Sequence, residues 1–148
     1  MKESRIHGKG VFANRAVRKS EVVLEIDDSH VVAEPSTLSD EDRQLLDSDL
    51  CDYLANGKTV LMQVPERYIN HSCDPNTYVK TMNGVRKVLA MRDIERGEEI
   101  TYDYAVNGYY GEPTACHCGS SNCRGVLLSD FFRLPKPLQM KYIPCLDA

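Results

Sequence analysis

The chain has 148 residues, of which 42% are hydrophobic and 27% are charged, and its formal net charge is −4. This composition is ordinary for a globular protein and predicts one domain. No apolar run approaches the ~20 residues that span a bilayer, and no apolar segment follows the charged start at residues 1–5, so we expect neither a membrane span nor a secretory signal. We therefore expect an intracellular protein, in the cytoplasm or on chromatin in a nucleus. The negative charge argues against direct nucleic-acid binding, which needs a basic surface.

Short strands dominate the chain up to about residue 104. Runs of apolar or β-branched residues, separated by Gly, Asp, Ser or Pro, predict strands at residues 11–13, 22–26, 30–33 and 59–64. Asn83-Gly84 lies between two further runs, residues 77–82 and 85–91, and predicts a two-residue hairpin turn because both residues tolerate positive φ. The fold class expected is therefore mainly β.

One segment, residues 36–50, has a helical pattern. Ser36 or Ser39 can cap it, three acidic residues follow at positions 40–42, and leucines at 45, 46 and 50 give a partial apolar face. We expect one short helical insert among the strands.

Two segments carry residues that are costly in a core. Asn70–Asn76 reads NHSCDPN and combines an amide, an imidazole and a thiol with a proline turn, a mixture typical of ligand sites. Gly97–Tyr104 reads GEEITYDY, so a strand there would project Tyr102 and Tyr104 from one face, about 6–7 Å apart. A hydrogen-bonded buried turn and ordinary strand packing of tyrosines also fit these residues.

The six cysteines point to a metal rather than to disulfides, because a reducing compartment is expected. Cys116, Cys118 and Cys123 are close in sequence, whereas a structural zinc needs four N or S ligands. His117 lies between two of them and would seldom reach the same ion. The other candidates for the fourth ligand are Cys51, Cys73 and Cys145. From residue 105 onward Gly, Pro and Cys are dense, so a zinc would hold this loop-rich element in one shape.

Taken together, the motifs resemble the SET-domain protein lysine methyltransferases. The resemblance has four parts in the expected order: Gly8–Gly10, Arg67–Asn76, Gly97–Tyr104, and the C-x-C-x4-C-R-G stretch Cys116–Gly125. It implies a compact SET fold of several small antiparallel sheets at residues 1–110, a zinc-tied post-SET loop element at 111–128, and a C-terminal tail at 129–148 that packs near the active site. The pre-SET zinc module of some relatives is not expected, because no cysteine cluster precedes the first motif.

The resemblance also implies cofactors. S-adenosyl-L-methionine would be bound by Gly8, Lys9, Gly10, Arg67, Asn70, His71 and Tyr104, leaving S-adenosyl-L-homocysteine as product, and Zn²⁺ would be bound by Cys73, Cys116, Cys118 and Cys123. In relatives the Asn side chain and the His backbone make the cofactor contacts, and the glycines let the backbone approach it. Taken alone, Gly8-Lys9-Gly10 is more simply interpreted as a turn before the strand at residues 11–13, and it lacks the third glycine of a dinucleotide fingerprint.

The catalytic residues implied are Tyr104, with its hydroxyl near the transferring methyl, Tyr102, which limits the number of methyls, and Tyr53 as a third wall of the lysine channel. Tyr68, Tyr78 and Tyr142 are interpreted as packing residues. Only a neutral amine can attack, and deprotonating lysine at pH 7.4 costs about 4 kcal/mol for a pKa near 10.4. A dry channel beside a positive sulfur lowers that cost. A protonated phenol at Tyr104 and a phenolate base are both open, and the Tyr102 hydroxyl favours monomethyl-lysine as product.

The leading hypothesis is methyl transfer to the ε-amine of lysine in a basic protein, histone-like or other. The alternative is a non-catalytic SET module that binds a peptide or partner protein. A degenerate module would be expected to lose the second tyrosine, the Asn-His pair or the cysteines, and this chain keeps all of them. A zinc-dependent nucleic-acid binder fits the cysteines but not the charge.

Overall fold

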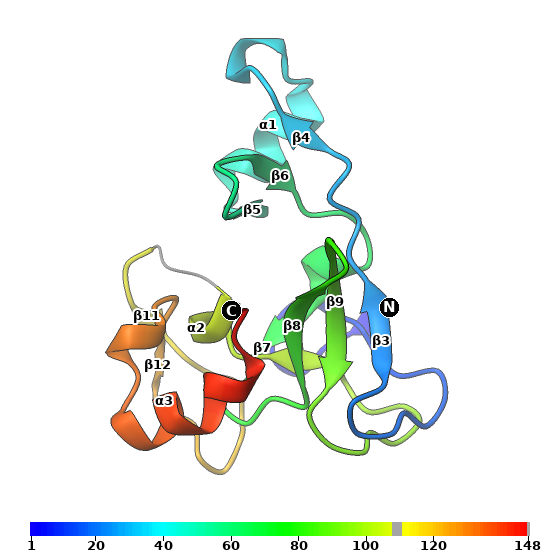
Figure 1. Ribbon diagram of the computed structural model, residues 1–148, viewed down its shortest axis with the longest axis vertical. Coiled ribbons are helices and arrows are strands. Elements are labelled where there is room, and N and C mark those ends of the chain that lie inside the picture. The colour runs from blue at the N-terminus through cyan, green and yellow to red at the C-terminus, as the bar shows by residue number, and fades with distance from the viewer. Residues whose placement is uncertain (108–110, 148) are drawn as a thin grey trace.

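The computed structural model describes residues 1–107 and 111–147, and over these residues the chain forms small sheets (Figure 1). The two three-stranded sheets consist of β3 (Val22–Glu25), β9 (Val85–Ala90) and β8 (Thr77–Met82), and of β4 (Val31–Val32), β6 (Thr59–Leu61) and β5 (Cys51–Tyr53). The two-stranded sheets pair β1 (Lys2–Glu3) with β2 (Lys9–Gly10), β7 (Asn70–His71) with β10 (Thr101–Tyr102), and β11 (Thr114–Ala115) with β12 (Val126–Leu127). The mainly β prediction with several small antiparallel sheets is confirmed.

The β8–β9 hairpin forms the centre of the molecule. It closes at Asn83 and Gly84, whose φ angles of 53° and 77° are the left-handed values that the turn requires, so the predicted hairpin is confirmed. Strand β3 pairs with the other edge of β9. The main core lies against this sheet and contains Val17, Ile26, Ile69, Val88, Ala90, Ile94, Ile100 and Tyr102.

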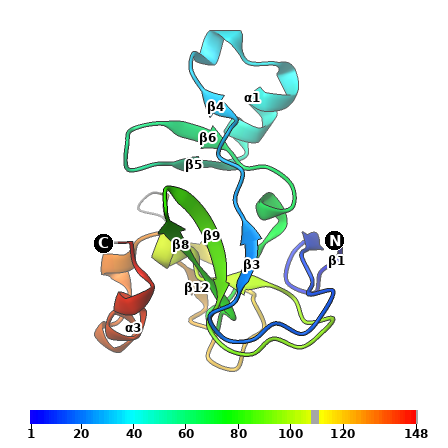
Figure 2. The same cartoon turned by 45° about the vertical axis from the view of Figure 1, so that its right-hand side comes forward.

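Residues 27–64, called the insert below, project from this core and carry the predicted helix (Figure 2). Helix α1 (Asp40–Asp47) is shorter than predicted. Its N-cap is Ser39, whose Oγ accepts a hydrogen bond from the N–H of Asp42 at 3.1 Å, whereas Ser36 lies in the preceding 3-10 turn η1 (Pro35–Thr37). In Figure 2 the insert lies as a separate layer above the β8–β9 hairpin.

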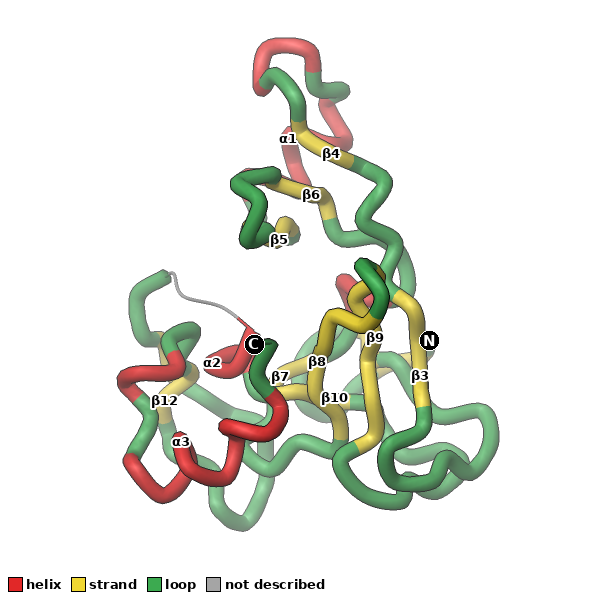
Figure 3. Tube along the Cα trace, in the orientation of Figure 1, coloured by secondary structure: helices red, strands yellow, loops and turns green. Residues whose placement is uncertain are grey.

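Strands β7 and β10 lie side by side (Figure 3). They run parallel, unlike every other strand pair of the described residues. The chain between them contains the whole β8–β9 hairpin, which returns it to the same direction. This pair places Asn70 beside Thr101 and His71 beside Tyr102. The two sequence motifs are thus joined directly by main-chain pairing.

The predicted strand through Tyr104 is wrong in its last residues. Strand β10 ends at Tyr102, and Tyr104 begins the short helix α2 (Tyr104–Asn107). The reason is Asp103, whose Oδ1 accepts the N–H of Ala105 at 3.1 Å and turns the chain into a helix. The predicted strand at residues 11–13 is reduced to a single bridge between Phe12 and Glu99.

The C-terminal tail contains a helix that the sequence reading missed. Helix α3 (Lys136–Tyr142) has Pro137 in its first turn, a known start signal, and is flanked by the 3-10 turns η3 (Phe131–Arg133) and η4 (Ile143–Cys145). A second core of Ala105, Leu128, Leu134 and Tyr142 packs the tail against α2. The turn η2 (Glu66–Tyr68) precedes β7. None of the described helices is long and apolar enough to cross a membrane.

Candidate active site and metal centre

Four cysteines meet at one point between β7 and the loop-rich C-terminal element. The Sγ atoms of Cys73, Cys116, Cys118 and Cys123 lie within 4.8 Å of one another. The Cys73 and Cys116 sulfurs are 3.7 Å apart, close to the ~3.8 Å that a tetrahedral site with metal–sulfur bonds of about 2.3 Å requires. The cysteines are all free thiols, and Cys51 and Cys145 are buried elsewhere. The donor set therefore fits a four-thiolate metal site.

Hydrogen-bond donors surround these sulfurs. The N–H of Cys73 donates to Cys118 Sγ, and the N–H of Arg124 donates to Cys73 Sγ, both at 3.4 Å. Ser120 Oγ lies 3.2 Å from Cys118 Sγ. Burial opposes ionisation of Cys118, but the backbone N–H of Cys73 and the contacts with Ser120 outweigh it and lower the pKa of Cys118 to about 6. Such donors favour thiolates, the form that binds metal.

Tyr102, which is buried, and Tyr104, which is partly buried, form a packed pair near these cysteines. Their ring centroids are 5.3 Å apart with planes tilted by 47°, and the Tyr104 hydroxyl donates to the carbonyl of Ile69 at 3.0 Å. Burial raises the pKa of Tyr104 to about 12 and raises that of Tyr102 well above its ordinary value. Both side chains are therefore neutral phenols near pH 7. For Tyr104 this favours the protonated phenol over a phenolate base.

Asn70 fastens the N-terminal loop to the middle motif. Its Nδ2 lies 3.1 Å from the carbonyl oxygen of His7, 3.0 Å from that of Lys9 and 2.9 Å from Glu99 Oε1. The same carboxylate explains why residue 10 is a glycine, because a Cβ at that position would overlap with the Glu99 side chain. Glu99 is thus a site residue that the sequence reading missed, although it lies inside the GEEITYDY motif.

Positive groups gather beside this loop. The Arg67 guanidinium lies 5.5 Å from the Tyr68 ring centroid and Lys9 Nζ lies 5.9 Å from it. Arg67 Nε is buried and has no hydrogen-bond partner in the described part of the chain. A buried donor without a partner is costly, so this position fits an anionic group of a ligand such as a carboxylate.

The His71 side chain is buried between the metal centre and Tyr104. Its Nδ1 accepts the N–H of Tyr104 at 3.3 Å, its Nε2 lies 3.4 Å from Cys73 Sγ, and its ring packs edge-on against the Tyr104 ring at 5.3 Å. Burial lowers the pKa of His71 to about 4, so the imidazole is neutral. The sequence reading had assigned a role only to the backbone of this residue.

A buried ion pair lies next to the same tyrosine. Asp103 accepts two hydrogen bonds from the Arg124 guanidinium, at 2.7 and 3.0 Å, and one from the Tyr142 hydroxyl at 3.3 Å. Asp103 and Arg124 were missed, whereas Tyr142 packs in the second core as predicted and its hydroxyl also reaches Asp103. Asp103 lies between the two motif tyrosines and Arg124 follows Cys123, so their positions inside motifs were the available signal.

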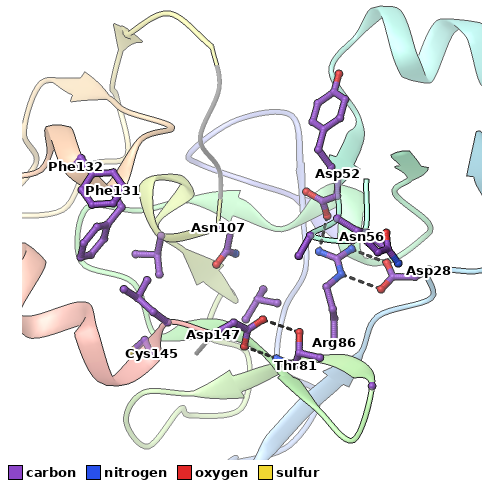
Figure 4. A pocket seen from close by; sticks show the side chains of 17 residues that line it. Asp28, Asp52, Asn56, Thr81, Arg86, Asn107, Phe131, Phe132, Cys145 and Asp147 are labelled. Atoms are coloured by element: carbon purple, nitrogen blue, oxygen red, sulfur yellow. Dashed lines mark hydrogen bonds and ion pairs between the residues drawn. The ribbon is translucent and has the colours of Figure 1, made fainter. Parts of the chain in front are cut away.

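A cleft of about 560 Å³ opens between the insert, the hairpin and the tail (Figure 4). On one side, Arg86 donates to both oxygens of Asp28, at 2.9 and 2.6 Å, and to Asp52 at 2.8 Å. Aromatic residues of the tail, Phe131 and Phe132, form the opposite side. The cleft thus has one ionic and one apolar wall.

Tyr53 lies on the wall of this cleft, and its side chain is exposed. It therefore belongs to a different element and environment from the packed pair of Tyr102 and Tyr104. The cleft reaches helix α2 at Val106 and Asn107, directly after Tyr104.

Behind the ionic wall lies Glu66, which the sequence reading also missed. Its Oε1 is 3.7 Å from Arg86, which already binds Asp28 and Asp52. Burial raises the pKa of Glu66 to about 8, against the attraction of Arg86, and the two aspartates add to the rise. Three carboxylates therefore share one guanidinium.

The comparison with protein families now identifies the chain. The SET domain model matches residues 8–105, so the chain belongs to the SET domain family. Among solved structures, the methyltransferase domain of human histone-lysine N-methyltransferase SETMAR is similar, with a TM-score of 0.61 and 20% identity over 86% of this chain and 56% of that one. At this identity the likeness supports the fold alone.

Curated relatives are named as histone-lysine N-methyltransferases. The chain is 34% identical to trithorax of Drosophila virilis over 136 residues, covering 84% of this chain and 3% of that protein. It is 49% identical over 65 residues to the H3 lysine-36 specific enzyme of Yarrowia lipolytica (41% of this chain and 8% of that protein). The H3 lysine-4 specific enzyme of Aspergillus oryzae is 30% identical over 143 residues, which is 84% of this chain and 11% of that protein. This chain therefore spans only a small part of these relatives.

Proposed function

We propose that this chain is a protein-lysine N-methyltransferase that uses S-adenosyl-L-methionine and acts on a basic protein. The observation that carries the proposal is a pair of neutral phenols, the buried Tyr102 and the partly buried Tyr104, held against β7. Helix α2, which begins at Tyr104, reaches the wall of a cleft that also carries acidic residues. Membership of the SET domain family and the names of the relatives support it.

We assign the cofactor to the N-terminal loop and the β7 motif. When bound, S-adenosyl-L-methionine would supply an electrophilic methyl on a positively charged sulfur. Asn70 fixes the loop by its contacts with the carbonyls of His7 and Lys9, so the loop backbone is ordered before the cofactor binds. Arg67 Nε is free to meet the carboxylate of the methionine part, together with the nearby charge of Lys9.

We assign the target lysine to the inner end of the cleft. A neutral phenol at Tyr104 cannot remove a proton, so its role is orientation of the reacting amine. Its hydroxyl donates to Ile69 and leaves oxygen lone pairs directed elsewhere. Deprotonation of the lysine is favoured instead by desolvation in the narrow site and by the positive sulfur.

The charge of the cleft supports a basic substrate segment. Its lining contains three carboxylates, Asp28, Asp52 and Asp147, and one guanidinium, Arg86. An excess of negative charge attracts Lys- and Arg-rich segments and raises their association rate. Histone tails have this chemistry, and some relatives are named for lysines of histone H3. A histone substrate would place the protein on chromatin.

We assign Zn²⁺ to the four cysteines, where the ion would supply a structural tie. Cys73 belongs to the cofactor motif and the other three ligands to the C-terminal element, so the site joins residues 111–128 to the SET domain at 1–110. The tail, residues 129–148, continues from it and contacts β8 through Asp147, which accepts hydrogen bonds from Thr81 at 2.7 and 2.6 Å.

Two substitutions test the proposed function. Tyr104→Phe should abolish most methyl transfer from labelled cofactor to a panel of histones and other basic proteins, while cofactor affinity by calorimetry is kept. Asn70→Ala should weaken cofactor binding, because the loop loses its tether. Normal cofactor affinity for Asn70→Ala would contradict the assigned cofactor site. Cofactor-independent binding of basic peptides without any transfer would favour the non-catalytic alternative.

A further inference from the structure

We propose that the His71 imidazole is a positioning residue that links the metal centre to Tyr104. The catalytic role of Tyr104 in this inference rests on the proposed function. The contacts between His71, Cys73 and Tyr104 are independent of the proposed function. His71 is the one described residue whose side chain reaches both a cysteine sulfur of the metal centre and the backbone of Tyr104. It would act without touching the substrate, through the position of the tyrosine.

The hydrogen bonds define one tautomer of the imidazole. Nδ1 accepts the N–H of Tyr104, so this nitrogen carries a lone pair rather than a proton. The proton of the neutral ring is therefore on Nε2, which lies 3.4 Å from Cys73 Sγ and donates to it. A metal-bound thiolate is a better acceptor than a thiol, so metal binding strengthens the contact that orients the ring.

A second connection runs beside the first, since His71 Nδ1 lies 3.6 Å from Asp103 Oδ1. Arg124 follows the ligand Cys123, and Asp103 precedes Tyr104, and these two side chains form the bidentate pair at 2.7 and 3.0 Å. The metal centre therefore holds the chain at residue 103 through Arg124 and at the N–H of residue 104 through His71.

These contacts fix the phenol as well as the backbone. The Tyr104 ring is packed between His71 and Tyr102, with both centroids 5.3 Å away, and its hydroxyl donates to Ile69. A shift of the imidazole would move the ring and its hydroxyl together. The cofactor loop is held separately by Asn70, so a loss of this link should affect turnover more than cofactor binding.

Two isosteric variants separate the two ends of the imidazole. In His71→Asn the amide oxygen replaces the Nδ1 acceptor, and in His71→Gln the amide N–H₂ replaces the Nε2 donor. One buried hydrogen bond corresponds to about a two- to twelvefold effect. We therefore expect His71→Gln to speed hydrogen exchange of the Tyr104 amide by about that factor and to keep zinc affinity. His71→Asn should leave hydrogen exchange of the Tyr104 amide unchanged and should lower zinc affinity by about that factor. Both quantities are measured on the full 148-residue chain, by NMR and by competition with a chromophoric chelator.

The kinetic readout is a split between kcat and KM. His71→Gln should lower kcat with little change in the KM for S-adenosyl-L-methionine. If the two variants alter exchange and zinc affinity in the same way, or if neither alters the Tyr104 amide, the proposal is wrong. If the exchange contrast is found but the wild-type protein transfers no methyl to any substrate, the link stands and the proposed function fails.

The wild-type chain provides a test that does not depend on folding of a variant. Zinc is removed with a chelator and returned, and exchange of the Tyr104 amide is compared with that of Val88, which is fully buried in the central hairpin. We expect reversible loss of protection at Tyr104 and none at Val88. An equal change at both amides, or no change at Tyr104, would overturn the proposal.

Discussion

Two ion clusters of this small domain differ in burial and in charge balance. Around Asp103, one carboxylate meets one guanidinium, from Arg124, and the remaining acceptor capacity is used by Tyr142 and the N–H of Ala105. Around Arg86, three carboxylates share one guanidinium. Both clusters connect elements that are distant in sequence, but only the first is neutral.

The difference separates a fixed part of the site from a responsive one. The Asp103 cluster is closed off from solvent and lies between the metal centre and Tyr104, so its role is to hold geometry. The Arg86 cluster borders the cleft and carries excess negative charge, and burial, against the attraction of Arg86, raises the pKa of its member Glu66 to about 8. Its charge therefore changes near physiological pH, and it borders the cleft to which we assign the substrate.

The strongest way to break the fixed part is to remove the metal. Cys73→Ser should lose the bound zinc and unfold the C-terminal element, since apparent zinc binding energies in small sites are about 10 kcal/mol or more. Cys145→Ser, a buried cysteine outside the cluster, is the matched control and should keep one zinc per chain. Metal analysis and thermal unfolding measure both. Zinc kept in the first variant and lost in the second would remove Cys73 from the site.

The balanced pair itself is broken by Asp103→Asn. This change leaves the Arg124 charge buried without its partner, and we expect a loss of about 3–5 kcal/mol in the free energy of unfolding. Asp147→Asn, at an exposed carboxylate, is the control and should cost about 1 kcal/mol or less. Denaturant titration decides the matter. A loss for Asp103→Asn no larger than the control would show that the pair does not hold the site.

The responsive cluster is tested by Glu66→Gln. The folded-state pKa of Glu66, about 8, is above its ordinary value of 4.5, so the protonated carboxyl stabilises the folded state at low pH. This contribution decreases as the pH rises from about 4.5 and is lost by about pH 8. The Glu66→Gln variant should lack this decrease. Between pH 5 and 8 the free energy of unfolding of the wild type should therefore fall by about 2–4 kcal/mol more than that of the variant.

Thermal unfolding at several pH values, with Glu25→Gln as an exposed control, measures this difference. Parallel pH curves for wild type and Glu66→Gln would show that Glu66 is ionised throughout. Such a result would remove the contrast between the two clusters.

The smallest effect is expected at Tyr102, which lies between the clusters and whose pKa is raised by burial, by Tyr104 and by Glu66 and Asp52. In the lysine channel we propose, its hydroxyl would leave less room for a methylated amine, so we expect monomethyl-lysine to dominate and Tyr102→Phe to shift product toward di- and trimethyl-lysine. One hydrogen bond gives about a two- to twelvefold preference. Mass spectrometry of a substrate peptide at early and late times checks this. Abundant trimethyl product that the substitution leaves unchanged would place the limit elsewhere in the channel.

Local patterns were sufficient for several features because neighbouring residues alone create them. Asn83-Gly84 specifies its hairpin through backbone conformations that few other residues adopt, and Ser39 caps α1 through a bond to a residue three positions away. The motif segments were found in the same way, as unusual residue types close in sequence. Even here local reasoning failed at Tyr104, where the Asp103 side chain ends the strand pattern.

The sequence by itself determined the mainly β class, the hairpin, the capped helix and the segments that carry the site chemistry. Only the tertiary structure decided that Cys73, rather than Cys51 or Cys145, meets the other three cysteines, and which partners the His71 ring contacts. The same is true of the four charged residues that share the second cluster, which come from positions 28, 52, 66 and 86. Such contacts depend on how whole elements pack, and no residue pattern along the chain encodes which distant charges will share one buried space.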